Sequence, residues 1–197
     1  MSSEVAICNL ALARIGVSEG IESLEDDQST EARVCNRLFA AVRDSLLRSF
    51  PWSFAMRDVA LALVAEYPVS GWRYSYRQPA DCLRIWALNP SRYQTVTVTP
   101  MGSGSDELGR LIYCDVEEAV LRYVHRVTDV ARWDVLFQEA VAWRLARELT
   151  MPLAIDRSLT AMAAEGEAAA IDAARAVMLN EEYDERPESE FIRARGP

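Results

Sequence analysis

The chain has 197 residues, of which 50% are hydrophobic and 26% charged, a balance typical of a globular protein of one large domain or two small ones. No apolar run approaches the ~18–20 residues that cross a bilayer, and the N-terminus lacks the basic and apolar regions of a signal peptide, so we expect a soluble intracellular protein without a membrane partner. The formal net charge is −9 and all 21 basic residues are arginine, which excludes a P-loop and Schiff-base chemistry because both need lysine.

The negative charge is concentrated in two segments. Residues 19–31 contain six acidic residues and no base, and residues 151–197 contain ten acidic residues and five arginines. Proteins that grip DNA concentrate positive charge, because neutralising phosphates supplies most of their affinity. The distribution of charge along the chain argues against a surface that binds DNA tightly and is compatible with an acidic surface that repels DNA.

Two helices are expected at the N-terminus. Apolar residues at helical spacing predict a first helix over residues 3–15, ended by Gly16 in a left-handed conformation. An acidic connector over residues 18–28 follows. Ser29 is placed to cap a second helix, which Pro51 ends because proline lacks the N–H and clashes with the preceding turn.

The middle of the chain, from Trp52 to about Thr128, has apolar residues with a period of two, which is typical of strands. The segment 116–127 fits either a helix or a strand, and its alternation favours a strand. Turn residues predict a connection over 101–109, in which the Gly-Ser-Gly-Ser-Asp run from Gly102 forms a flexible hairpin tip rather than a phosphate-binding loop. The other expected strands cover residues 56–64, 72–77, 82–88, 95–99 and 110–114.

Helical spacing returns near the C-terminus and predicts one helix over residues 133–149, ended by Pro152, and a last helix from about residue 156 or 158 to residue 183. The expected fold class is therefore α+β: terminal helices that form a roughly four-helix bundle, with an inserted, mostly antiparallel β-sheet region. The corresponding division of the chain is 1–52 for the N-terminal helices, 53–128 for the β-rich insertion, 129–183 for the C-terminal helices and 184–197 for a flexible C-terminal arm.

No motif in the sequence points to a reaction. His125 is the only side chain suited to acid–base work at neutral pH, and no nucleophile motif such as G-x-S-x-G accompanies it. The pairs Glu117–Glu118 and Glu181–Glu182 are adjacent in sequence and point apart, unlike carboxylates that face each other across a glycosidase cleft. The four widely spaced cysteines favour small buried hydrophobes over disulfides. We therefore expect no catalytic, cofactor-binding or metal-binding residue, and no enzyme.

An aromatic stretch in the middle of the chain has Trp72, Tyr74 and Tyr76 alternating with Arg73 and Arg77. Nucleic-acid-binding proteins use such interleaving to stack bases. The acidic balance of the rest of the chain favours a different interpretation, in which the aromatic face of a strand packs on the helical bundle and the arginines lie on the opposite face.

Three segments of the N-terminal half form a recognisable order. Residues 7–17 read Ile-Cys-Asn-Leu-Ala-Leu-Ala-Arg-Ile-Gly-Val, residues 21–26 read Ile-Glu-Ser-Leu-Glu-Asp, and residues 46–55 read Leu-Leu-Arg-Ser-Phe-Pro-Trp-Ser-Phe-Ala. This order resembles the N-terminal half of the tail tubular protein A family, the head-to-tail adaptor proteins of short-tailed phages and related prophages. Residues 79–84, Pro-Ala-Asp-Cys-Leu-Arg, and the expected helix over residues 137–149 continue the resemblance.

The resemblance implies a structural virion protein that self-associates into a ring of about twelve copies under the portal. Its implied partners are the portal protein and a downstream tail protein, with no cofactor. DNA would pass through the channel without specific binding, and the protein would occur in the virion and, during assembly, in the host cytoplasm. The alternatives are a small non-catalytic regulatory or binding protein and, less favoured, a virion-associated cell-wall hydrolase.

Two groups of residues are candidates for this function. An acidic lining avoids adhesion of DNA in a channel, and the candidates for such a channel or acidic surface are the connector residues Glu22, Glu25, Asp26 and Asp27. The C-terminal arm ends in an apolar pair flanked by arginines, and segments of this kind commonly order on a partner, although an inert frayed terminus is the alternative. The candidates for contact with the portal or a neighbouring subunit are Phe191, Ile192, Arg193 and Arg195.

Overall fold

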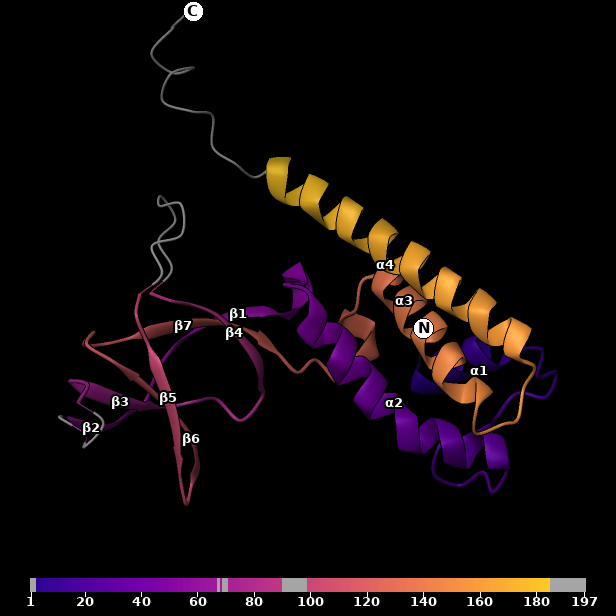
Figure 1. Ribbon diagram of the computed structural model, residues 1–197, viewed down its shortest axis with the longest axis horizontal. Helices are drawn as coiled ribbons and strands as arrows, with labels where there is room; N and C mark the ends of the chain where they lie inside the picture. The colour runs from indigo at the N-terminus through magenta and orange to yellow at the C-terminus, as the bar shows by residue number, and fades with distance from the viewer. Residues whose placement is uncertain (1–2, 67, 69–70, 90–98, 185–197) are drawn as a thin grey trace, which may run out of the picture. The chain divides into compact units, whose positions relative to one another are not determined.

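The computed structural model describes residues 3–66, 68, 71–89 and 99–184, and there it combines four α-helices with two antiparallel sheets, which confirms the α+β class (Figure 1). The chain divides into two compact units, a helical unit of Met1–Val42 and Trp133–Pro197 and a β unit of Arg43–Arg132. The division falls inside α2 (Thr30–Ser49), whereas the change of pattern in the sequence predicts a boundary at residue 52. No helix in the described part of the chain is long and apolar enough to cross a membrane.

The N-terminal helices begin and end at the residues that the sequence predicts. Helix α1 (Glu4–Arg14) is capped by Ser3, whose Oγ accepts a hydrogen bond from the backbone N–H of Ala6 at 3.1 Å. Gly16 follows α1 with a φ of +80°, a left-handed conformation that glycine adopts without a steric penalty. Helix α2 is capped in the same way by Ser29, whose Oγ accepts from the N–H of Ala32 at 3.1 Å.

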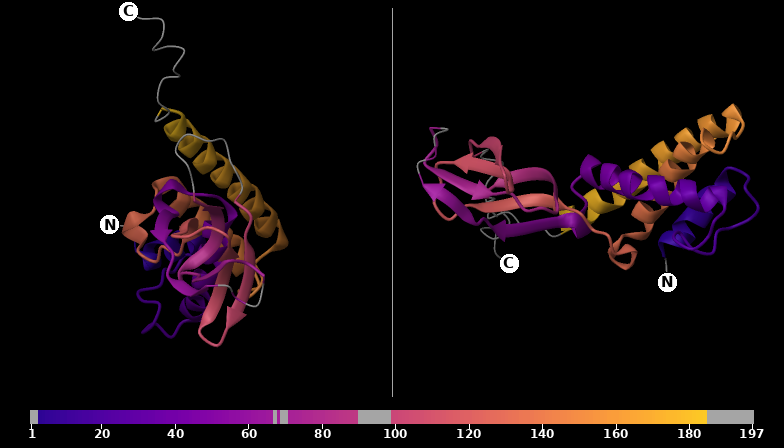
Figure 2. Two further views of the ribbon diagram at one scale, coloured as in Figure 1. Left: turned by 90° about the vertical axis from the view of Figure 1, so that its left-hand side faces the viewer. Right: turned by 90° about the horizontal axis from the view of Figure 1, so that it is seen from below.

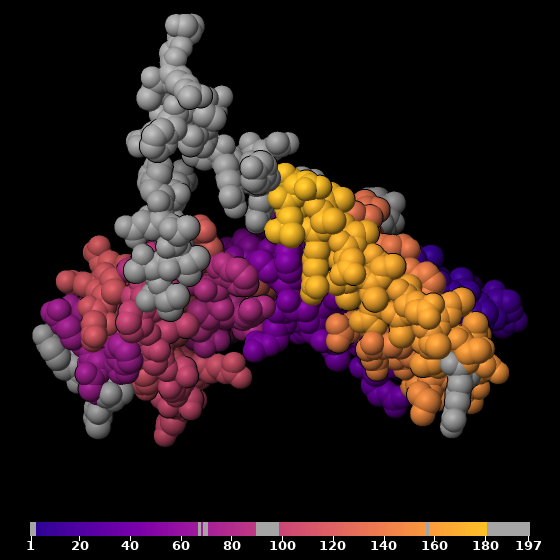
Figure 3. Space-filling model, turned by 45° about the horizontal axis from the view of Figure 1, so that its top comes forward, coloured from indigo at the N-terminus to yellow at the C-terminus, as the bar shows by residue number. Residues whose placement is uncertain are grey.

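The C-terminal helices α3 (Val135–Thr150) and α4 (Arg157–Asp184) form the other half of the helical unit. Asp134 caps α3 by accepting from the N–H of Leu136 at 2.8 Å. Helix α3 packs against both α1 and α4, and Figures 1 and 2 show α4 running along α3. Seen as a surface, α4 forms an exposed ridge on the helical unit (Figure 3).

The helical unit is held together by an apolar core and one buried ion-pair group. The side chain of Trp133 stacks on Phe39 of α2 and meets Phe137 of α3 edge-on, with ring centroids 6.2 and 5.3 Å apart. The fully buried residues of α3 face this core. They are Phe137, Ala140, Val141, Ala142, Leu145, Ala146 and Leu149.

The β unit contains two antiparallel sheets. The three-stranded sheet has the order β1 (Met56–Ala60), β7 (Val120–His125), β4 (Cys82–Leu88). The four-stranded sheet has the order β2 (Leu63–Glu66), β3 (Tyr74–Arg77), β6 (Gly109–Cys114), β5 (Gly102–Asp106). The strand preference over 116–127 is thereby confirmed in β7. The expected strand over 95–99 falls almost wholly outside the described residues.

The prediction of one continuous strand over 56–64 is wrong, because β1 and β2 belong to different sheets. The chain crosses between the sheets at Leu61 and Ala62. The N–H of Leu61 donates to the carbonyl of Ala119 at 2.9 Å, and the carbonyl of Ala62 accepts from the N–H of Arg77 at 2.9 Å. Alternation in sequence does not reveal such a change of partner, because the side-chain period is the same in both sheets.

The interpretation of 101–109 as a flexible connection is also wrong, because Gly102–Asp106 forms the edge strand β5 against β6. Its glycines fit beside two aromatic side chains, those of Tyr113 in β6 and of Trp72, which precedes β3. A Cβ on Gly104 would lie 2.5 Å from Oη of Tyr113, and one on Gly102 would lie 2.9 Å from Nε1 of Trp72. At these positions glycine allows the close approach of an aromatic side chain and does not form a turn. Amino-acid composition alone does not distinguish this use of glycine from its use in a loop.

The β unit has a core of its own. Tyr74 and Tyr76 of β3 are buried in it, and Oη of Tyr76 donates to the carbonyl of Val116 at 2.8 Å. Ser75, between the two tyrosines, is buried as well, so β3 does not have the exposed opposite face that the alternation suggested. Side chains from both sheets, and that of Ala119 just before β7, complete this core. The residues from the sheets are Leu88, Ile112, Cys114, Leu121 and Tyr123.

Candidate functional site

The acidic residues singled out in the sequence lie in the connector between α1 and α2. Glu22, Glu25 and Asp26 are exposed there, and Asp27 is half-buried. The connector surrounds a hollow of about 680 Å³ whose lining includes Glu22, Asp26 and Asp27. The structure thus brings three of the four predicted residues together on one concave, acidic surface.

Asp27 shapes the connector itself. Its carboxylate accepts hydrogen bonds from the N–H of Ser29 at 2.8 Å and from the N–H of Glu22 at 3.2 Å. The bonds from Ser29 and Glu22 hold the pKa of Asp27 below its usual range. Asp27 therefore closes the loop on which the other acidic residues lie. Its position two residues before the cap Ser29 indicates this role in the sequence.

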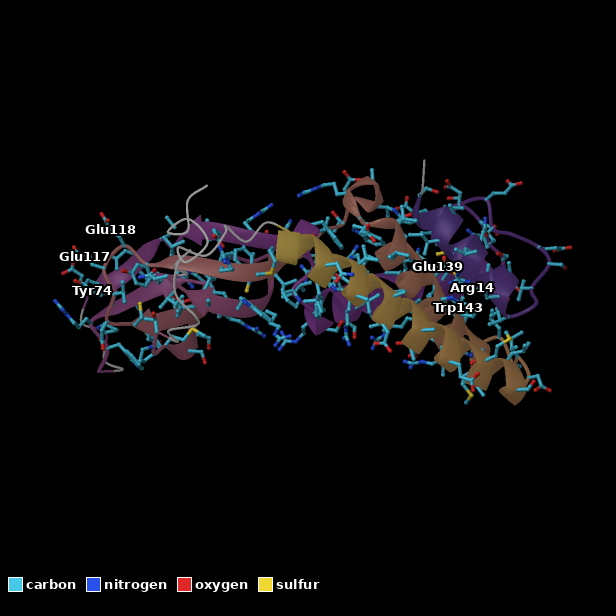
Figure 4. All side chains as sticks on the ribbon, turned by 90° about the horizontal axis from the view of Figure 1, so that it is seen from above. Arg14, Tyr74, Glu117, Glu118, Glu139 and Trp143 are labelled. Carbon is cyan, nitrogen blue, oxygen red and sulfur yellow. The ribbon has the colours of Figure 1, made fainter. Side chains whose placement is uncertain are left out.

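The arm residues Phe191, Ile192, Arg193 and Arg195 lie outside the described residues, so their contribution to an interface stays a prediction. The side chains of Glu181 and Glu182 also lie outside the described part of the structure. The other adjacent pair, Glu117 and Glu118, is exposed between β6 and β7, as expected of solvated carboxylates (Figure 4).

His125 is buried in β7 and has a structural partner. Its Nδ1 lies 2.8 Å from the carbonyl oxygen of Ala55, and a carbonyl only accepts, so Nδ1 carries the proton. Among the described residues Nε2 has no hydrogen-bond partner. Burial lowers the pKa of His125, partly offset by the bond to Ala55, while Arg57 lowers it further. The imidazole is therefore held neutral in the folded chain.

We expect the folded protein to lose stability on mild acidification because of His125. In the unfolded chain the imidazole of His125 takes up a proton near pH ~6.5. In the folded chain its pKa is lowered, so it takes up the proton only at a lower pH. The free energy of unfolding therefore falls as the pH drops through and below ~6.5. Urea unfolding followed by circular dichroism between about pH 7.5 and 5.5 measures the effect. His125→Gln removes the only histidine, and its stability should be flat over this range; an equal slope in both proteins would contradict the assignment.

The cysteines behave largely as the sequence indicates. All four are free, and Cys8, Cys35 and Cys114 are buried. The thiols of Cys8 in α1 and Cys35 in α2 are hydrogen-bonded, and this bond together with burial raises the pKa of Cys8. Within the described residues no group of three or more His, Cys, Asp or Glu side chains is placed to hold a metal ion.

A second charged cluster, on the helical unit, joins α1 to α3. The guanidinium of Arg14 donates to the carboxylate and to the carbonyl of Glu139, and it stacks on the ring of Trp143 at 4.1 Å from the centroid (Figure 4). On α4, Glu167 is buried between Arg144 and Arg147 of α3, with N···O distances of 3.6 and 2.7 Å. These pairs satisfy charges at the contacts between the helices.

The β unit has a groove lined by arginines that the sequence does not predict. It consists of two adjoining hollows of about 860 and 590 Å³, which share Arg48, Gln78, Cys82, Leu83 and Arg110. Its lining includes parts of β4 and β5, each the last of the described strands of its sheet. The signal in the sequence is faint, since the arginines come from five separate segments. They are Arg48, Arg77, Arg84, Arg110 and Arg126.

Two of the groove arginines have carboxylate partners. Arg77 forms a bidentate pair with Asp106 at 2.6 and 2.7 Å, which holds the pKa of Asp106 at about 2. Arg126 pairs with Asp44 at 2.7 Å. The remaining three, Arg48, Arg84 and Arg110, have no carboxylate partner within the described part of the chain; Arg48 and Arg84 donate to backbone carbonyls instead. The groove therefore presents uncompensated positive charge on an acidic protein.

A scan against models of known protein families matches none of them. A search of the curated proteins finds no match either.

Proposed function

We propose that this chain is a head-to-tail adaptor of a short-tailed phage or prophage, a virion protein of the tail tubular protein A type with no catalytic role. The proposal rests on the order of the three sequence segments in the N-terminal half that carry the resemblance, together with the structural roles of their residues. Gly16 ends α1 with a positive φ, Ile21 is buried at the start of the connector, and Trp52 is buried where α2 leads into the β unit. The same residues that make the resemblance are the ones that build the scaffold.

In this proposal the helices form a four-helix bundle that is the body of each subunit, and the copies assemble into a ring of about twelve under the portal. Glu22, Glu25 and Asp26, exposed on the connector, are the acids that would keep DNA from adhering in the channel. A downstream tail protein would bind the other side of the ring. During assembly the subunits would occur in the host cytoplasm before they join the virion.

Portal binding provides the test. The purified chain is mixed with the portal protein and imaged by negative stain, and rings seated on the portal are the expected result. Removing residues 184–197 should abolish attachment while leaving the melting temperature nearly unchanged, because the arm is too polar to form a core. Unaltered portals with the full chain would contradict the adaptor, and turnover of peptidoglycan in the same preparation would favour the hydrolase. Normal attachment of the truncated chain would place the portal contact on the helices.

A further inference from the structure

The charge of the chain is divided unequally between its two units. Residues 43–132 contain eleven arginines and ten acidic residues, whereas the rest of the chain contains ten arginines and twenty acidic residues. The arginine groove thus belongs to the one unit without a negative excess. A groove with three uncompensated arginines attracts an anionic group, because pairing a guanidinium with carboxylates adds hydrogen bonds as well as charge attraction.

The groove also has features suited to an extended peptide. Among the strands that the structure describes, β4 and β5 are each the last of their sheet, and an edge strand presents backbone N–H and C=O groups to an added segment. Apolar surface lies beside the arginines: Leu83 and Pro79 line the groove, and Leu108, which also lines it, is 84% exposed. A matching segment would carry carboxylates next to apolar side chains.

Two segments of the chain are acidic enough to fit, and their apolar residues distinguish them. In the connector, Ile21 is buried and the carboxylates of Asp26 and Asp27 accept hydrogen bonds within the loop. The segment 185–192, which follows the end of α4 at Asp184, contains three acidic residues and one arginine and ends in Phe191 and Ile192. Its sequence therefore provides both kinds of group that the groove can pair.

We propose that the arginine groove binds the acidic segment 185–192, which follows α4, of a second copy of this chain. The carboxylates pair with Arg48, Arg84 and Arg110, and Phe191 and Ile192 contact the exposed Leu108. Such a contact is heterologous, since the groove of one copy takes the segment of the next, and repeated heterologous contacts close into a ring when the rotation between copies allows it. The inference rests on the ring in the proposed function and names the surfaces that join its subunits.

Peptide binding to the full chain tests the groove without any portal. A fluorescein-labelled peptide with the sequence of residues 181–197 is titrated with the protein, and binding is followed by anisotropy at about 50 mM salt. We expect saturable binding that weakens about fivefold or more in Arg110→Glu and in Leu108→Glu, and that weakens as salt is raised.

Neither the side chain of Arg110 nor that of Leu108 has a hydrogen-bonding or ionic partner in the described structure, so neither change should unfold the protein. Arg132→Glu is the matched control, because Arg132 is an exposed arginine of the β unit outside the groove. Equal binding by all variants would overturn the proposal.

A mixing experiment shows whether the segment comes from a second copy. One variant keeps the groove and carries Glu185→Gln, Glu188→Gln and Glu190→Gln; the other keeps the segment and carries Arg84→Glu and Arg110→Glu. Each alone should sediment as a monomer, and the mixture should form a heterodimer, because only the mixture contains one native groove and one native segment. Peptide binding without a heterodimer would mean that each chain fills its own groove, which overturns the proposal.

Two further measurements separate peptide binding in the groove from DNA binding there and from the adaptor role. A labelled DNA duplex that binds more tightly than the peptide, and loses binding in Arg110→Glu, would overturn the proposal in favour of phosphate recognition. Rings on portals without peptide binding would reject the groove and keep the adaptor. Peptide binding and heterodimers without rings on portals would keep the groove and reject the adaptor.

Discussion

Replacing Trp52 by alanine should lower the free energy of unfolding by about 3–5 kcal/mol, since truncating a buried aromatic removes its apolar contacts and leaves a cavity. Trp52 is 0% exposed, and its Nε1 donates to the carbonyl of Leu46 at 3.0 Å. Its ring also lies 5.1 Å from Phe50 and 6.5 Å from Phe54, centroid to centroid. Alanine would therefore remove the aromatic centre of the corner between α2 and β1 and the hydrogen bond that holds it.

Urea unfolding followed by circular dichroism measures this effect without depending on tryptophan fluorescence. Trp86→Ala is the matched control, because Trp86 is 47% exposed on β4 and its ring contacts the guanidinium of Arg84. We expect the control to cost about 1 kcal/mol or less, in the range of exposed cation–π contacts. Equal losses in the two variants would show that the corner does not depend on Trp52.

Replacing Gly166 by alanine should destabilise the protein by about 1–3 kcal/mol, the cost of overpacking a tight contact, although alanine is the better helix former by about 1 kcal/mol. A Cβ at this position of α4 would lie 2.6–2.8 Å from three atoms of the Trp143 ring. The ring cannot move freely, because Arg14 stacks on it and pairs with Glu139. The close approach of α4 to α3 thus requires glycine here.

A double-mutant cycle separates the clash from the helix propensity. In a Trp143→Ala background the ring is absent, so Gly166→Ala should become neutral or stabilising. The expected result, measured again by urea unfolding, is that the destabilisation by Gly166→Ala disappears in this background. The same loss in both backgrounds would show that Gly166 is required for a reason other than Trp143.

Most of the local structure of this protein follows from short stretches of its sequence. Ser3 and Ser29 predict helix starts, Gly16 predicts a helix end, and the structure places all three in these roles. Residues 82–88 predict a strand and form β4. These signals are local, because a cap or a turn depends on hydrogen bonds among neighbours in the chain.

Features that depend on residues far apart in the sequence emerge only in the folded chain. Folding assigns β1 and β2 to different sheets, makes the glycine-rich segment at Gly102 an edge strand beside Tyr113, and gives the β unit its own core. It also brings Arg48, Arg84 and Arg110 to one groove. Strand pairing and convergent charges are set by partners dozens of residues away, so alternation and composition in one segment do not encode them.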